Sequence, residues 1–101
     1  MTSNFQLLDA VPSYTRDLAS TDQIKWSGDF EVPAVGDVVV MRINRIGRAQ
    51  VVGYATESGY LGVLTVPFNP PDWWVRQNGP ASRDNAALAF GAEILPAEHA
   101  G

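Results

Sequence analysis

Two β-branched stretches joined by a short turn constrain this chain more than any other feature. Residues 48–56, RAQVVGYAT, predict one strand, and residues 60–68, YLGVLTVPF, predict a second strand that returns antiparallel to the first. The segment Glu57-Ser58-Gly59 between them predicts a tight turn. A β-hairpin is therefore expected at the centre of the fold.

Further strands are predicted on both sides of this hairpin. Residues 24–32, IKWSGDFEV, alternate between apolar and polar side chains, with Trp26 and Phe30 on the apolar face, and predict a half-buried strand. Residues 37–43, DVVVMRI, predict a strand whose core side is formed by Val39, Met41 and Ile43. Residues 86–95, AALAFGAEIL, also alternate and predict the last strand, with a helix over this alanine-rich segment as the alternative.

The segments between and before these strands carry breaking signals. Pro70 and Pro71 offer no N–H to a ladder, so residues 69–85 are expected to form a long loop. One helical turn is expected around Asp72, whose side chain is a candidate cap. Residues 1–23 lack a clear period and predict an N-terminal extension with a short helix over 13–19, and residues 96–101 predict a tail.

About five short antiparallel strands with tight turns predict an all-β domain, residues 24–95, that curls into a small barrel to hide its edges. Gly36-Asp37 before a β-branched strand, the turn from Asn44 to Gly47, and the strings VVGY, VLTV and AEI resemble SH3-like small barrels, including KOW and Tudor domains, over residues 33–95. This resemblance implies a non-catalytic module that holds ligands with rim aromatics. The string NPPDWWVRQNG followed by FGAEI also looks like small proteins of bacterial mobile elements, which implies a bacterial origin and no particular function.

Composition narrows the function classes. The 101 residues suffice for one domain, and the absence of cysteine excludes disulfides and thiol chemistry. No basic segment precedes a long apolar run, so a protein without membrane spans and located in the cytoplasm is expected. The single histidine, His99, lies in the tail, and no known catalytic or metal-binding motif occurs, so neither an enzyme nor a cofactor or metal is expected.

Adjacent tryptophans in the proline-rich loop are the strongest functional signal. Neighbouring residues point in different directions in a helix or a strand, so one indole is expected in the core and the other outside, as an anchor for a protein partner. The alternative is that both are structural. The candidate partner-binding residues are Trp73, Trp74, Tyr54, Tyr60 and Arg76.

A second hypothesis is nucleic-acid binding. The net charge of −4 opposes a general grip on phosphates, but the string MRINRIGR is locally basic. The candidate contacts are Arg42, Arg45, Arg48 and Lys25, with an aromatic ring stacking on a base. A third hypothesis is a homo-oligomer that uses the two-sided apolar strand at 60–68 as its interface.

Overall fold

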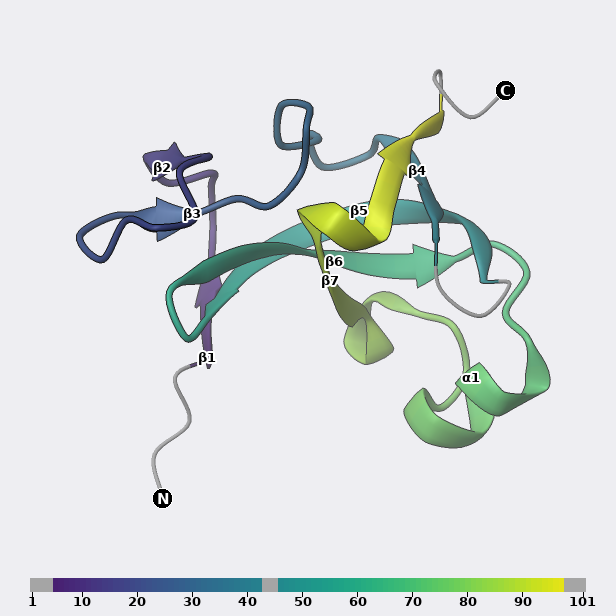
Figure 1. Cartoon of the computed structure of the whole chain (residues 1–101). Helices are drawn as coiled ribbons and strands as arrows, with labels where there is room; N and C mark the ends of the chain where they lie inside the picture. The colour runs from purple at the N-terminus through teal and green to yellow at the C-terminus, as the bar shows by residue number, and fades with distance from the viewer. Residues whose placement is uncertain (1–4, 43–45, 98–101) are drawn as a thin grey trace.

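The structure is a computed structural model that describes residues 5–42 and 46–97, and its strands form one sheet (Figure 1). At its centre lies the predicted hairpin, β5 (Gly47–Glu57) and β6 (Tyr60–Pro67), paired antiparallel. Ser58 and Gly59 connect the two strands with φ angles of 54° and 84°. Two positive φ angles in a two-residue loop match the right-handed twist of a hairpin, which explains this turn sequence.

The other strands pair along the two outer edges of this hairpin. On the β5 side, β4 (Val38–Met41) pairs with its first half and β1 (Phe5–Leu8) with its second half. On the β6 side lie β7 (Ala87–Phe90), antiparallel, and β3 (Ile24–Lys25), parallel and followed outward by β2 (Tyr14–Thr15). The N-terminal segment therefore contributes two strands to the sheet, and the helix expected over 13–19 is absent there.

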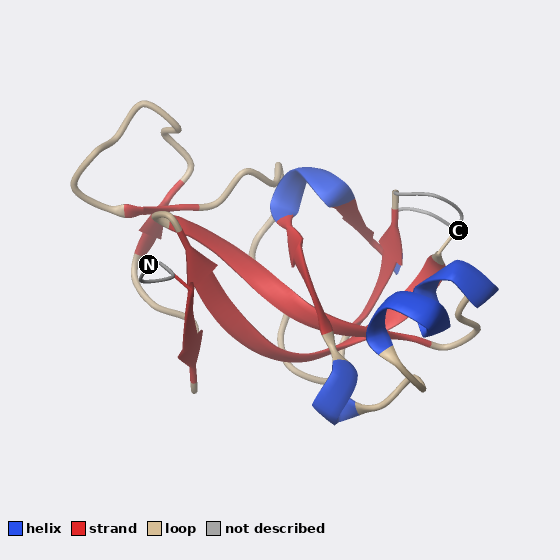
Figure 2. Ribbon diagram, turned by 90° about the horizontal axis from the view of Figure 1, so that it is seen from below, coloured by secondary structure: helices blue, strands red, loops and turns tan. Residues whose placement is uncertain are grey.

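The end of the chain crosses from one edge of the sheet to the other. β7 pairs with β6, and β8 (Ile94–Pro96) pairs with β4. The single last strand predicted for 86–95 is in fact two strands separated by a 3₁₀ turn, Gly91–Glu93, in which the Glu93 carboxylate accepts a hydrogen bond from the Phe90 N–H at 2.8 Å. The sheet curls into a half-barrel around the core (Figure 2).

A β-bulge in β5 decides which side chains enter the core. Val51 pairs with Thr65 and Gly53 pairs with Leu64, so Val52 is an extra residue with no partner of its own. One extra residue reverses the inward and outward faces of a strand. Ala49 and Val51 are therefore buried before the bulge, and Tyr54 and Thr56 are buried after it, where Ala55 on the other face is also buried.

The continuous strand predicted for 24–32 is wrong, because the chain leaves the sheet after Lys25. The Trp26 indole N–H donates to the Phe30 carbonyl at 2.7 Å, which bends the chain back on itself. Gly28 packs so closely against Gly91 that a Cβ on Gly91 would lie 2.7 Å from the Gly28 Cα. The alternation still reports burial, since Trp26 and Gly28 are inside and Asp29 and Glu31 are exposed.

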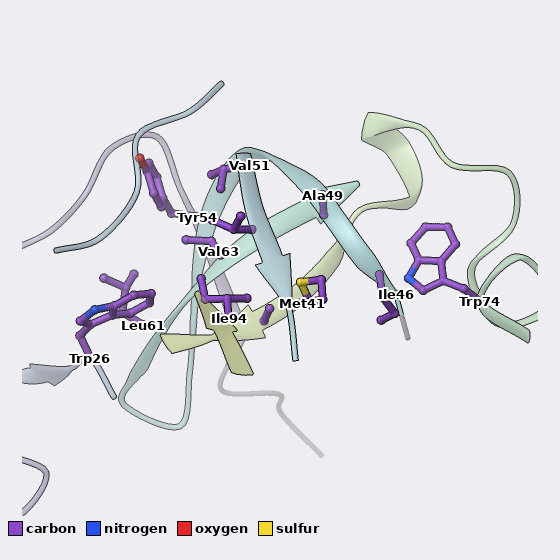
Figure 3. Close-up of a cluster of buried hydrophobic side chains, with 12 residues drawn as sticks. Trp26, Met41, Ile46, Ala49, Val51, Tyr54, Leu61, Val63, Trp74 and Ile94 are labelled. Carbon is purple, nitrogen blue, oxygen red and sulfur yellow. The ribbon is translucent and has the colours of Figure 1, made fainter. Parts of the chain in front are cut away.

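The core runs between two tryptophans, with Trp26 beside Leu61 at one end and Trp74 beside Ile46 at the other (Figure 3). Val39 and Met41 face this core as predicted, and Ile43 lies outside the described residues. Across residues 5–42 and 46–97, no helix is long and apolar enough to cross a membrane.

Candidate partner-binding surface

The helix α1 (Asp72–Asn78) carries both adjacent tryptophans on the long loop between β6 and β7. It starts directly after Pro71, and Asp72 is its first residue, so Asp72 makes no side-chain cap, contrary to the prediction. The helix ends at Gly79, whose φ of 89° is one that glycine adopts readily. This loop, residues 68–79, is called the aromatic loop below.

The two indoles occupy different environments, as the divergence of neighbouring residues in a helix requires. Trp74 is 2% exposed and belongs to the core cluster at the Ile46 end (Figure 3). Trp73 is half-buried and packs against the edge of the same cluster. Trp74 therefore anchors α1, and the part of Trp73 that the core leaves uncovered is accessible to solvent.

Other side chains of the aromatic loop are exposed despite being apolar. Phe68 is 59% exposed and Val75 is 37% exposed, and Arg76 is exposed beside Val75. The Phe68 N–H donates to the Arg48 carbonyl at 3.1 Å, which holds the start of the loop beside β5. The loop thus presents apolar side chains on a fixed base. Phe68 and Val75 were not among the predicted residues, although two large apolar residues flanking a proline-tryptophan segment are visible in the sequence.

Tyr54 is not accessible to a partner, in contrast with the prediction. It is 5% exposed, and its hydroxyl donates to the Pro33 carbonyl at 2.7 Å. Burial raises the pKa of the Tyr54 phenol, and the nearby Asp37 carboxylate raises it further. The bulge at Val52 is the cause, because without the extra residue Tyr54 would share the outer face with Arg48.

Tyr60 lies apart from the aromatic loop, at the hairpin end of the sheet. Its ring meets Phe90 edge to face, with ring centroids 6.4 Å apart, and the Lys25 ammonium lies 4.9 Å from the centre of the Tyr60 ring. Tyr60 and Phe90, together with Ser27, Glu57 and Ser58, line a shallow pocket of about 360 Å³. Tyr60 and Trp73 therefore cannot form one rim.

The predicted basic residues also separate. Lys25 pairs with Tyr60, whereas Arg48 lies nine residues before Glu57 in β5, which is about 30 Å of extended chain away. Arg42 and Arg48 are both exposed, and Arg48 is paired with Val40, two residues before Arg42, so the two arginines share one face. Arg45 lies outside the described residues.

Within the described part of the chain, no group of three histidine, aspartate or glutamate residues is placed to hold a metal ion. His99 lies outside that part. Asp29 and Glu31, the carboxylates that share a face in the sequence, are both exposed on the loop after β3. Both carboxylates are therefore in contact with solvent.

Comparison with known proteins gives no match to a family model, to a curated protein or to a solved structure.

Proposed function

We propose that this chain is a non-catalytic binding module built on an SH3-like barrel, and that the aromatic loop contacts a protein partner. The pairing of β4 with β8 supports the barrel, because these are the first and last strands of the segment 38–96 and they meet only if the sheet curls. The bulge at Val52 adds to the same curvature, since bulges increase local twist.

The observation that supports the proposal most strongly is the different burial of side chains within the aromatic loop. Trp74 supplies the buried anchor and Trp73 packs against the edge of the core, whereas Phe68 and Val75 are exposed. The aromatic loop carries exposed apolar side chains, a partly exposed tryptophan and an arginine, and aromatic residues and arginine are enriched at interface centres. Because the base is already ordered, binding costs little additional conformational entropy.

Recovery of bound proteins from the native host with the tagged full chain tests this function. The double variant Phe68→Ser/Val75→Ser is compared with Val11→Ser/Leu18→Ser, which removes two exposed apolar side chains elsewhere. We expect wild type and the control to retain a partner protein after nuclease treatment, and the loop variant to lose it. Equal recovery by all three proteins contradicts the proposed role of the loop.

Nucleic-acid binding is the second candidate, and the shared face of Arg42 and Arg48 favours it. The Phe68 N–H donates to the Arg48 carbonyl. An aromatic residue therefore lies beside Arg48 at this end of the sheet. Titration of labelled single- and double-stranded oligonucleotides at two salt concentrations tests it, with Arg48→Gln as the variant and Arg16→Gln as the exposed control. If the arginines contact phosphates, the affinity for the oligonucleotide falls as the salt concentration rises. Arg48→Gln then weakens binding, and Arg16→Gln does not.

A further inference from the structure

A groove that shares no lining residue with the Tyr60 pocket is not used by any of the surfaces described above. Residues 30–33, residues 37–39 and residues 96–97 line it, and it encloses about 560 Å³. Its walls are the loop after β3, the start of β4 and the end of β8, and we call it the β4–β8 groove. A volume of this size lies in the range of sites that enclose a ligand or a few residues of a peptide.

The charges in the β4–β8 groove are all of one sign. Among the described residues, its lining contains the carboxylates of Glu31 and Asp37, both exposed, and no lysine or arginine. The remaining lining residues are apolar. One Asp37 oxygen accepts a hydrogen bond from the Ala34 N–H at 2.9 Å, which fixes the orientation of this carboxylate. A cationic group next to an apolar one is therefore the complementary occupant.

One stretch of backbone along the groove is held at both of its ends by hydrogen bonds. On one side the Phe30 carbonyl accepts from the Trp26 indole, and on the other the Pro33 carbonyl accepts from the Tyr54 hydroxyl, each at 2.7 Å. Between these two fixed points, the N–H and C=O groups of Glu31 and Val32 have no hydrogen-bond partner in the parts of the chain that the structure describes. This segment has the alternation of a strand, but within residues 5–42 and 46–97 no strand pairs with it.

Unpaired, ordered backbone beside a groove is the arrangement to which an extended peptide adds by main-chain hydrogen bonds. Side chains of such a peptide alternate, so apolar ones reach the half-buried Val38 and Pro96 while basic ones reach the carboxylates at the rim of the groove. A compact cation satisfies the charges but leaves the apolar floor and the backbone unused.

We propose that the β4–β8 groove binds an extended peptide segment of a partner protein in which basic and apolar residues alternate. The site is separate from the aromatic loop, so the two proposals stand or fall independently. Glu31 supplies the exposed charge and pairs its backbone with the peptide, and Asp37 supplies the fixed charge.

The probes are two labelled peptides, acetyl-GVKVRVKVG-amide and its acidic counterpart acetyl-GVEVEVEVG-amide, titrated into the full chain by fluorescence anisotropy. Binding of the basic peptide and not the acidic one is expected. Glu31→Lys is expected to weaken the basic peptide about tenfold, since a like charge replaces an attractive one. Asp29→Lys is the matched control, because it makes the same charge change two residues away and outside the groove, and a change below about twofold is expected.

The site is located by amide chemical shifts, which are expected to move at Glu31, Val32 and Ala97. N-methylation of the peptide backbone at its central residue is expected to reduce affinity at unchanged charge, because it removes one main-chain donor. Equal effects of Glu31→Lys and Asp29→Lys, or shifts centred on another surface, overturn the proposal.

Two further outcomes identify a different occupant or a shared site. If the peptide-free protein self-associates by light scattering and Glu31→Lys abolishes the association, a second copy fills the groove and the partner peptide is excluded.

Phe68→Ser/Val75→Ser is expected to leave the affinity for the basic peptide unchanged. A loss of affinity in that variant makes the groove part of the aromatic loop's surface and overturns a separate site.

Discussion

Trp26 and Trp74 close opposite ends of one core, but the chain surrounds them in different ways (Figure 3). At the Trp26 end, the indole bonds to the Phe30 carbonyl, the ring meets Phe30 edge to face, and Gly28 packs on Gly91. At the Trp74 end, one buried indole anchors a helix whose neighbouring apolar side chains remain exposed. At the first end these residues pack against one another, and at the second end Phe68 and Val75 leave apolar surface exposed.

The largest expected effect concerns the Trp26 end. Trp26→Ala removes a fully buried indole and leaves a cavity, so the free energy of unfolding is expected to fall by about 3–5 kcal/mol. Urea denaturation followed by circular dichroism measures it, and Trp26→Phe, which keeps an aromatic ring there, is expected to lose less. A loss below about 1 kcal/mol for Trp26→Ala means that this end is not part of the core.

Gly91→Ala tests the close approach of two backbone segments at the same end. The new Cβ collides with the Gly28 backbone, which cannot rotate away, so a loss of about 1–3 kcal/mol is expected. Gly53→Ala is the control, because its Cβ meets only the end of the Leu64 side chain at 3.3 Å. The same urea midpoint for both variants contradicts the packing of Gly28 on Gly91.

Tyr54→Phe leaves the Pro33 carbonyl without its donor and is expected to cost about 1–2 kcal/mol. The pH dependence adds a second signature. The folded-state pKa of Tyr54 is raised, so its contribution to stability is complete below the unfolded-state pKa of about 10 and is lost as pH rises through the folded-state pKa. Wild type is therefore expected to lose more stability above pH 10 than Tyr54→Phe does. If the stabilities of the two proteins change in parallel with pH, the buried Tyr54 hydroxyl does not stabilise the fold.

The smallest effect is expected at the Trp74 end. Phe68→Ser/Val75→Ser replaces exposed side chains, so the free energy of unfolding is expected to change by no more than about 0.5 kcal/mol while partner recovery is lost. Thermal denaturation measures the stability term separately from binding. A large loss of stability places Phe68 or Val75 in the packing of the fold and removes the distinction between the two ends.

Local patterns predicted the parts of the fold that depend on local geometry. The turn at Ser58-Gly59 and the β-branched composition of the two strands sufficed for the hairpin, and Pro70-Pro71 sufficed for the loop that follows it. The break after Lys25 was not predictable, because it depends on Gly28 meeting Gly91, 63 positions along the chain. An isolated alternating segment looks the same whether or not a partner strand lies beside it.

The parts of the candidate site that depend on local geometry were predicted, and the parts that depend on strand pairing were not. The different burial of Trp73 and Trp74 follows from helix or strand geometry alone. The burial of Tyr54 depends on the bulge at Val52, and the separation of Lys25 from Arg48 depends on which strands pair. Proximity in sequence had grouped residues that the sheet holds apart.

The central claim is that the adjacent indoles divide between stability and recognition, and the free energies of unfolding of Trp73→Ala and Trp74→Ala test it most directly. Urea titrations followed by circular dichroism compare the two variants under identical conditions. Trp74→Ala is expected to lose about 3–5 kcal/mol and Trp73→Ala at least about 2 kcal/mol less, because Trp73 buries only part of its ring. Equal losses in the two variants contradict the account.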